Sequence, residues 1–444
     1  MNAILQLDAV EQRNRLASGA LRAVEVAEAY LAEIERREPE VGAWAWLDGD
    51  YVMDQAKALD DYRSRGHAIG ALHGLPVGLK DIIDTAGVPT ENGTVLDAGR
   101  KPTADAFVVK RLRQAGAVIM GKTVTAELAL RSPGKTRNPH NPAHTPGGSS
   151  SGSAAAVAAG MVPLALGTQT MGSVIRPASY CGVVGYKPTF GAIPRSGVLA
   201  QSATLDTLGV FAGSVGAAAL LADSLFGHDS ADPATALMPA PRLAEIAGAA
   251  PPVAPHFAFV PSPAWAVAEP AMREGFAELH EALGGHCDEV ELPGAFTDAA
   301  KLCEIVQLAE LAKSYHHYEK RGRDALSPEM QTAIDDGSRI LARDYLAARD
   351  WQALLNDGLE AIFSRFDAII TPAAPGPAPE GLGSTGSPAF NGLWTFCGTP
   401  AITLPLLQAD SGLPMGVQLV GRRGDDGRLL RSARWLVGFL SQTD

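Results

Sequence analysis

The feature that most constrains this chain is a segment rich in proline, glycine and serine. Residues 132–153 read SPGKTRNPHNPAHTPGGSSSGS, and the closely spaced prolines and glycines exclude a regular helix or strand through it. Because strongly apolar stretches of one core precede and follow the segment, we expect an ordered loop packed on that core, not a flexible linker. The loop leads into SAAAVAAGM, which predicts an alanine-rich helix with several serines at its start.

Helical and strand-like patterns alternate along the rest of the chain. Apolar residues recur at helical spacing between Leu21 and Ile34 and predict an amphipathic helix that Pro39 ends. Two apolar runs flank Lys80, and glycine and proline punctuate them like strands and turns. The alternation favours a layered α/β sheet. Helices are predicted over 4–38, 48–65, 104–115, most of 269–366 and after 427, and strands at 117–120, FDAIITP, TPAITLPL and MGVQLVG.

Composition narrows the classes of partner and compartment. The net charge of −12, from 37 basic and 49 acidic residues, argues against nucleic acid or an anionic membrane surface as the main partner. The amino-terminal end meets charged residues too early for a secretory signal, and the most apolar run, residues 154–167, is too short to span a bilayer. The 4 cysteines are scattered without a CxxC pair, which suits a reducing compartment. We therefore expect a cytoplasmic enzyme.

Three short segments carry residues suited to catalysis. They are GLPVGLKD, which contains Lys80, PGGSSSGSA, which contains Ser149, and GTQTMGSVIRPAS, which contains Ser173. Together with KDIIDTAGVPTENGT, CGVVGYKPTFGAIPRSGV, PAITLP and GLPMGVQLVG, they make the chain resemble the amidase-signature family over nearly its whole length. This resemblance implies a layered α/β/α fold with a large mixed central sheet covered by helices.

The resemblance also implies that the chain is a single domain. Residues 228–256, rich in alanine and proline, are expected to form a surface excursion between two halves. Within 1–444 we expect N-terminal helices at 1–65, a signature core at 66–227, a more variable and mostly helical region at 228–365, and a return to the sheet at 366–444.

Members of this family use a Ser–cis-Ser–Lys triad, which the resemblance places on Ser173, Ser149 and Lys80. A serine hydroxyl attacks a carbonyl group only when a neighbouring base takes its proton. Lysine can be that base if burial lowers its pKa enough to leave it neutral near pH 7, and the apolar residues before Lys80 favour such burial. Ser149 would relay the proton and later protonate the leaving nitrogen. The resemblance also implies a cis peptide bond between Gly148 and Ser149.

The turn before the nucleophile is expected to hold the oxyanion of the tetrahedral intermediate. Its donors would be the backbone N–H groups of Thr170, Met171, Gly172 and Ser173. Glycine suits so tight a turn. In enzymes, the loss of one such donor costs about 2.7–4 kcal/mol of transition-state stabilisation.

This turn departs from the commonest family form, GTDTGGSIR. Gln169 replaces the acid, Met171 replaces a glycine, and the arginine is displaced to Arg176. The pattern is similar to the GTQT-x-GSVIRP subgroup that includes malonamidase-like enzymes, in which this arginine binds a substrate carboxylate. Arg176 is thus expected either to bind the carboxylate of an amide substrate or to hold the local structure. Met171 is expected either to line the acyl pocket or to change the local backbone.

Other catalytic patterns are present without the structure they require. GSSSG satisfies GxSxG and would make Ser150 the nucleophile of an α/β-hydrolase elbow, but no strand precedes it. Ser132 and Lys135 satisfy SxxK, but the Pro–Gly pair between them disfavours the helix that this motif needs. Residues 381–386 satisfy GxGxxG, again without a preceding strand. No HExxH motif asks for a metal, and we expect no cofactor.

The sequence therefore predicts a serine amidohydrolase that cleaves the C–N bond of a small amide through an acyl-enzyme. One alternative is the same triad acting on carbamate, urea-derivative or ester bonds. Another is a glutamine-hydrolysing subunit of a tRNA-dependent amidotransferase, against which the departures at Gln169, Met171 and Ile175 count. The expected partner is a small-molecule amide or carbamate, with no nucleic acid and no membrane, and the resemblance suggests a homodimer.

Overall fold

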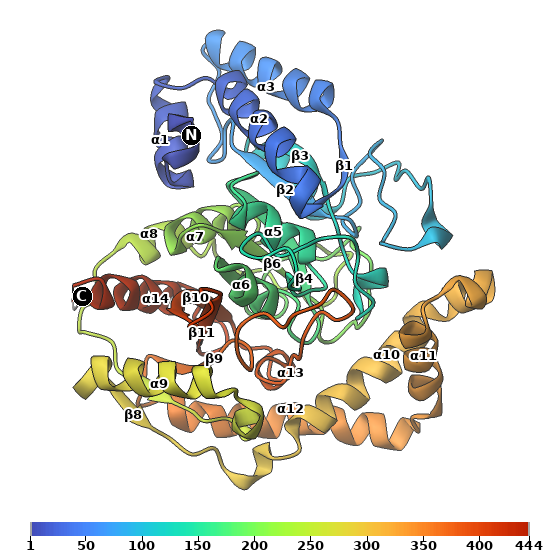
Figure 1. Ribbon diagram of the computed structural model, residues 1–444, viewed down its shortest axis with the longest axis vertical. Helices are drawn as coiled ribbons and strands as arrows, with labels where there is room; N and C mark the ends of the chain where they lie inside the picture. Colours follow the sequence, from blue (N-terminus) through green and yellow to red (C-terminus); the bar gives the residue numbers. More distant parts are fainter. Residues whose placement is uncertain (1, 443–444) are drawn as a thin grey trace.

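A mixed sheet of 11 strands forms the centre of the computed structural model, which describes residues 2–442 (Figure 1). In chain order the strands are β1 (Trp44–Leu47), β2 (Pro76–Lys80), β3 (Val118–Thr123), β4 (Leu164–Gln169), β5 (Val184–Lys187), β6 (Thr207–Ala212), β7 (Phe257–Phe259), β8 (Cys287–Glu289), β9 (Ala368–Pro372), β10 (Ala401–Gln408) and β11 (Pro414–Val420). Their order in the sheet is β1-β3-β2-β4-β6-β5-β10-β11-β9-β7-β8. β2 pairs in parallel with β3 and β4, whereas the middle strands from β4 to β9 pair antiparallel.

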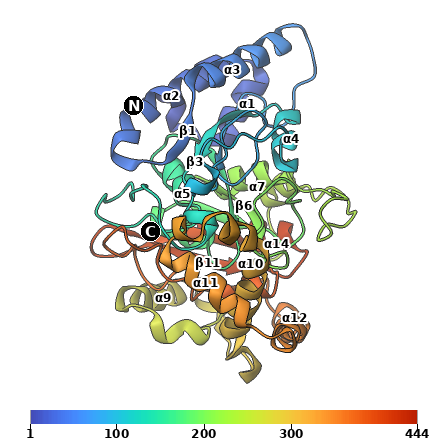
Figure 2. The same cartoon turned by 90° about the vertical axis from the view of Figure 1, so that its right-hand side faces the viewer.

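Helices cover this sheet, which confirms the expected layered α/β fold (Figures 1 and 2). They are α1 (Ala9–Ser18), α2 (Ala23–Val41), α3 (Gly49–Ser64), α4 (Phe107–Gln114), α5 (Ser151–Ala158), α6 (Ile175–Cys181), α7 (Val215–Asp223), α8 (Leu243–Gly248), α9 (Pro270–Leu283), α10 (Ala299–Gly322), α11 (Pro328–Arg339), α12 (Ala342–Phe363), α13 (Gly392–Phe396) and α14 (Asp426–Leu440). α5 and α6 pack on each other and on the central strands, and α7, α8 and α14 form a second group on those strands. α10 and α11 pack together and reach away from the sheet (Figure 1).

The amino-terminal helix predicted over residues 4–38 is two helices, and Pro39 does not end the second. Gly19, with a φ of 82°, ends α1 in the left-handed conformation that glycine adopts freely. α2 runs through Pro39 and ends at Gly42, whose φ is 63°. A proline in the last turn removes one hydrogen bond, and the Glu38 carboxylate accepts the two backbone N–H groups after Gly42, which stabilises this longer helix end.

The second apolar run beside Lys80 is not a strand, and that prediction was wrong. The chain turns directly after Lys80, whose carbonyl oxygen accepts the N–H groups of Ile82 (2.7 Å) and Ile83 (3.0 Å). Ile83 then makes one isolated bridge to Val198. An apolar run indicates that a segment is buried. A turn inside the core is buried as a strand is, so the apolar pattern does not distinguish the two.

The loop at residues 132–150 is ordered against the core, as predicted. Asn138 is fully buried and donates from Nδ2 to the carbonyl oxygens of Thr145 (3.1 Å) and Tyr180 (2.8 Å). Residues 145–150 are buried, and α5 begins directly after them. The loop thus places its serines beside β2 and β4, two interior strands of the sheet.

The second half of the chain follows the predicted pattern. Residues 228–256 lie largely exposed and contain the short helix α8, whereas α9 to α12 make up most of 269–366. The strands predicted at FDAIITP, TPAITLPL and MGVQLVG are β9, β10 and β11. Within residues 2–442, no helix combines the length and the apolar character needed to cross a membrane.

Candidate active site

Lys80 lies at the end of β2 with its side chain completely buried. Its Nζ donates to the hydroxyl oxygens of Ser149 (2.8 Å) and Thr168 (2.9 Å). Burial lowers the Lys80 pKa to about 7, because desolvation disfavours the ammonium, while the negative charge of Asp206 acts in the opposite direction. The amine is therefore partly neutral at neutral pH.

Ser149 follows a cis peptide bond from Gly148, as the family resemblance implied. Glycine is needed at 148, because a Cβ there would lie 2.6 Å from the Thr385 Cγ2 atom. Ser150, the alternative GxSxG nucleophile, is fully buried and donates its hydroxyl to the Thr168 carbonyl oxygen (3.2 Å). Lys135 of the SxxK pattern is exposed and lies outside any helix.

The turn at residues 170–173 connects β4 to α6. Gln169 fixes it from within, because its Oε1 accepts the N–H groups of Val174 (2.9 Å) and Ile175 (3.0 Å) and its Nε2 donates to Thr395 Oγ1 (2.9 Å). The amide that replaces the usual acid thus still caps the turn and gains a donor. In the described part of the chain, no hydrogen bond is recorded from the four backbone N–H groups at 170–173, so they are available to an oxyanion.

Ser173 opens onto a cavity of about 210 Å³. The cavity is also lined by Met171, Arg176 and Thr385. The structure brings Lys80 and Ser149 into direct contact, but between residues 2 and 442 it records no hydrogen bond of the Ser173 hydroxyl to Ser149 or to any other group. α6, which follows Ser173, packs on the loop that carries Ser149.

Arg176 makes that contact between α6 and the loop. Its Nη2 donates to the carbonyl oxygen of Gly148 (2.6 Å) and to Thr385 Oγ1 (3.3 Å). Its Nε is buried without a partner, and no carboxylate in residues 2–442 forms an ion pair with it. Burial lowers the Arg176 pKa to about 10, which marks a desolvated cation. Arg176 therefore holds the Gly148 carbonyl group, and it lines the cavity as a cation without a carboxylate partner among the described residues.

Met171 lies on the wall of the same cavity. Its sulfur lies 3.3 Å from Cys303 Sγ on α10, and its carbonyl oxygen accepts from Thr395 Oγ1 (3.0 Å) on α13. Gly392 gives the methyl group room, since a Cβ at that position would lie 3.1 Å from Met171 Cε. Met171 thus lies in the wall of the candidate site, and its role toward the acyl group stays a prediction.

Two residues of the site were missed by the sequence reasoning. Thr168 accepts a hydrogen bond from the amine of Lys80. The only feature of the sequence that could have pointed to Thr168 was its place in the GTQT run. Asp206 is a buried acid in the apolar run TLDTLGV, a pattern that can be searched for. It accepts a hydrogen bond from Thr170 Oγ1 (2.6 Å), and burial raises its pKa to about 6.

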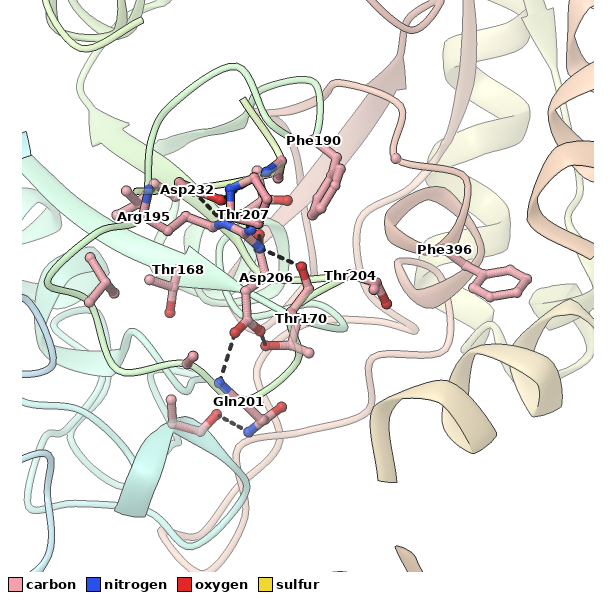
Figure 3. A pocket seen from close by; sticks show the side chains of 18 of the residues that line it. Thr168, Thr170, Phe190, Arg195, Gln201, Thr204, Asp206, Thr207, Asp232 and Phe396 are labelled. Carbon is pink, nitrogen blue, oxygen red and sulfur yellow. Dashed lines mark hydrogen bonds and ion pairs between the residues drawn. The ribbon is translucent and has the colours of Figure 1, made fainter. Parts of the chain in front are cut away.

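A second, larger cavity of about 520 Å³ has Thr168, Thr170 and Asp206 in its wall (Figure 3). Neither Ser149 nor Ser173 lines it. The smaller cavity is the candidate active site, because it contains Ser173 and Arg176 together. Among the described residues, no group of three or more His, Cys, Asp or Glu side chains is placed to hold a metal ion.

Comparison with known proteins agrees with this fold and these motifs. The chain belongs to the amidase family, the amidase-signature hydrolases, whose model, described as Amidase, matches residues 25–430. One glutamyl-tRNA(Gln) amidotransferase subunit, from Chloroflexus aggregans, is 35% identical over 94% of this chain and 93% of its own length. The corresponding protein of Streptomyces coelicolor is 33% identical, with 97% and 95% covered.

Solved structures of similar proteins share the whole architecture. A chain described as part of a vestigial protein complex that reveals the origins of an s-triazine catabolic enzyme has a TM-score of 0.91 at 29% identity, with 97% of this chain and 98% of that one covered. The peptide amidase of Stenotrophomonas maltophilia has a TM-score of 0.82 at 29% identity, with 97% and 96% covered.

Proposed function

We propose that this protein hydrolyses the C–N bond of a small amide through an acyl-enzyme on Ser173, with Ser149 as proton relay and Lys80 as base. One observation carries the proposal: a fully buried lysine amine lies 2.8 Å from the hydroxyl oxygen of Ser149, and within residues 2–442 no ion pair with an acid is recorded for it. A lysine so placed has a pKa low enough to accept a proton near neutral pH.

The first half of the reaction forms the acyl-enzyme. Neutral Lys80 takes the proton of Ser149 while Ser149 takes the proton of Ser173, and Ser173 Oγ bonds to the carbonyl carbon. The resulting oxyanion is stabilised by backbone N–H groups at 170–173. The proton then returns from Lys80 through Ser149 to the leaving nitrogen, the C–N bond breaks, and the amine departs.

The second half reverses the roles with water as the nucleophile. The same relay removes a proton from water, the hydroxide oxygen adds to the acyl carbon, and the C–O bond to Ser173 breaks as the proton returns to Ser173 Oγ. A carboxylic acid leaves, and the three side chains regain their starting protonation.

Covalent labelling tests this proposal without a known substrate. A fluorophosphonate is expected to form one adduct, on Ser173, because its phosphorus reacts with an activated serine beside an oxyanion hole. Peptide mass spectrometry locates the adduct in the wild type. Ser150→Ala serves as the matched control and should still be labelled on Ser173. An adduct on Ser150 in the wild type would contradict the assignment and favour the α/β-hydrolase interpretation.

A carboxylate-bearing amide is the proposed substrate class, because Arg176 lines the cavity as a desolvated cation and no ion pair with a carboxylate is recorded for it within residues 2–442. Arg176→Leu is expected to lower kcat/KM for the monoamide of a short dicarboxylic acid about 10- to 100-fold more than for the uncharged amide of equal length. Steady-state kinetics on both substrates measure that ratio. Equal losses on both amides would assign Arg176 to holding the Gly148 carbonyl group alone.

The amidotransferase relatives favour a second candidate, the glutamine-hydrolysing component of a complex, since they match the chain over nearly its full length. The two candidates differ in what the purified chain does alone. The first expects hydrolysis by the isolated protein, as a homodimer. The second expects glutamine hydrolysis that depends on partner subunits. Assays of the same preparation on glutamine, aryl amides, aryl carbamates, urea derivatives and esters separate them.

A further inference from the structure

Asp206 is a buried carboxylate beside Thr170, at the start of the turn that leads to the nucleophile (Figure 3). It precedes β6, the strand that pairs with β4, and its Oδ1 accepts the hydroxyl of Thr170, the first residue of the turn, at 2.6 Å. We propose that Asp206 is a positioning residue, which fixes the turn at 170–173 through Thr170 and supplies negative charge to Lys80. This inference rests on the proposed function, and it assigns to that reaction a side chain that touches no substrate.

Hydrogen bonds within its own loop fix the position of the Asp206 carboxylate. Its Oδ2 accepts the backbone N–H groups of Gln201 (2.8 Å) and Ser202 (2.9 Å), and the Asp206 N–H donates to the Ser202 carbonyl oxygen (3.0 Å). Arg195 Nη1 donates to the Asp206 carbonyl oxygen (3.1 Å). Both oxygens are therefore used, one by its own loop and one by Thr170.

That anchor determines where the backbone donors of the turn lie. Gln169 holds the far end of the turn through the N–H groups of Val174 and Ile175, and Asp206 holds its near end through Thr170. The N–H groups between these two anchors have no protein partner in the described chain. They are oriented by the two anchors together with the hydrogen bond from Thr395 Oγ1 to the Met171 carbonyl oxygen (3.0 Å). Oxyanion donors act through such preorganisation, and a misplacement of 1 Å costs about 100-fold in rate.

The charge of Asp206 also reaches the base. Lys80 Nζ donates to Thr168 Oγ1 (2.9 Å), and Thr168 lines the same cavity as Asp206. The negative charge of Asp206 opposes the lowering of the Lys80 pKa by burial. The ionisable groups that face Asp206 are Lys80 on β2, Arg195, whose charge favours the carboxylate, and Tyr315 on α10. Without this carboxylate the Lys80 pKa should fall further, since burial would act alone.

Three variants separate the two parts of the role. Thr170→Val removes the anchored hydroxyl and leaves the charge, Thr170→Ser keeps both, and Asp206→Asn keeps an acceptor for the 201–202 N–H groups but removes the charge and the acceptor facing Thr170. Thr207→Val is the matched control, because Thr207 is a buried threonine in the same cavity wall whose hydroxyl donates to Leu205 instead.

The readout is the rate of Ser173 labelling by a fluorophosphonate, resolved into the maximal rate and the half-saturating concentration, from pH 5 to 9. We expect Thr170→Val and Asp206→Asn to lower the maximal rate about 10- to 100-fold, with the half-saturating concentration within about 3-fold. Thr170→Ser and Thr207→Val should remain within about 3-fold of the wild type. The acid limb of the pH profile should move to lower pH in Asp206→Asn and stay in place in Thr170→Val.

The outcomes separate this inference from the proposed function. Wild-type protein that is not labelled on Ser173 overturns both. Ser173 labelling at the wild-type rate in Thr170→Val and Asp206→Asn overturns the positioning role alone, as does a Thr170→Ser variant no faster than Thr170→Val. An unmoved acid limb in Asp206→Asn overturns the supply of charge to Lys80. Circular dichroism of each variant confirms that the slower ones are folded.

Discussion

Replacing Ser173 with alanine is expected to abolish turnover, with a loss of about 10⁴- to 10⁶-fold in kcat. The substitution removes the atom that would bond to the carbonyl carbon, so no acyl-enzyme can form and the proton relay from Lys80 through Ser149 has no nucleophile to activate. The measurement is kcat of the purified variant on the carboxylate-bearing amide preferred by the wild type, together with the loss of fluorophosphonate labelling.

The fold should tolerate this change. Ser173 has no recorded hydrogen bond among residues 2–442, so alanine leaves no buried partner unsatisfied, and the melting temperature should stay close to that of the wild type. Ser150→Ala is the contrasting variant. The Ser150 hydroxyl makes a hydrogen bond inside the core and takes no part in the proposed reaction, so this variant should keep most of the activity. Full turnover by Ser173→Ala would contradict the proposed mechanism.

Local sequence pattern was sufficient for the parts of the site that depend on neighbours in the chain. Apolar residues before Lys80 predicted a buried strand, and β2, an interior strand of the sheet, buries that lysine completely. Closely spaced prolines and glycines between apolar stretches predicted an ordered loop, and its serines reach the sheet. Local pattern failed at Pro39, where the helix could end or continue, and after Lys80, where an apolar run could be a strand or a buried turn. In both cases tertiary contacts decide between the two structures.

The remaining parts of the site depend on contacts that no local pattern carries. Asp206 reaches Thr170 across 36 residues of sequence, and Gln169 reaches Thr395 across 226. The direction of the Met171 side chain is set by Cys303 and by the absence of a Cβ at Gly392, which lie on helices distant in sequence. The order of the strands in the sheet brings these groups together, so each became visible only with the fold.

Replacing Lys80 with methionine is expected to lower kcat about 10²- to 10⁴-fold, the usual contribution of a general base. Methionine has similar length and no proton to exchange, so Ser149 loses its acceptor while the volume is retained. Ser173 labelling should slow by a similar factor. The variant keeps Ser173 and the turn, so slower labelling would show that Ser173 is less activated.

The same variant is expected to be more stable than the wild type at neutral pH. The Lys80 pKa is lowered by burial from 10.5 to about 7, a desolvation cost on the order of 5 kcal/mol in the folded state. The hydroxyl groups of Ser149 and Thr168 lose a donor, which costs about 1–3 kcal/mol. A net gain of roughly 2–4 kcal/mol in the free energy of unfolding follows.

The gain in the free energy of unfolding is expected to depend on pH. Between about pH 7 and 10.5 the unfolded wild type keeps the lysine proton that the folded protein has lost, so wild-type stability from this group rises with pH in that window. The advantage of Lys80→Met should therefore be largest below pH 7 and shrink toward pH 10. Urea unfolding at pH 6.5 and 9.5 measures the difference.

Lys122→Met is the control for burial itself. Lys122 is also fully buried, on β3 beside β2. Burial lowers its pKa to about 8, a smaller shift than for Lys80, because the negative charges of Asp81 and Asp84 act in the opposite direction. Lys122 Nζ donates to the Ile83 carbonyl oxygen and to Thr90 Oγ1 (2.9 Å), so its removal leaves these buried acceptors unsatisfied and takes a compensating charge away from Asp81. Lys122→Met should thus lose stability at pH 6.5, where Lys80→Met gains it. If both variants lost stability, Lys80 would be a structural cation, and the buried neutral base on which the reaction depends would be contradicted.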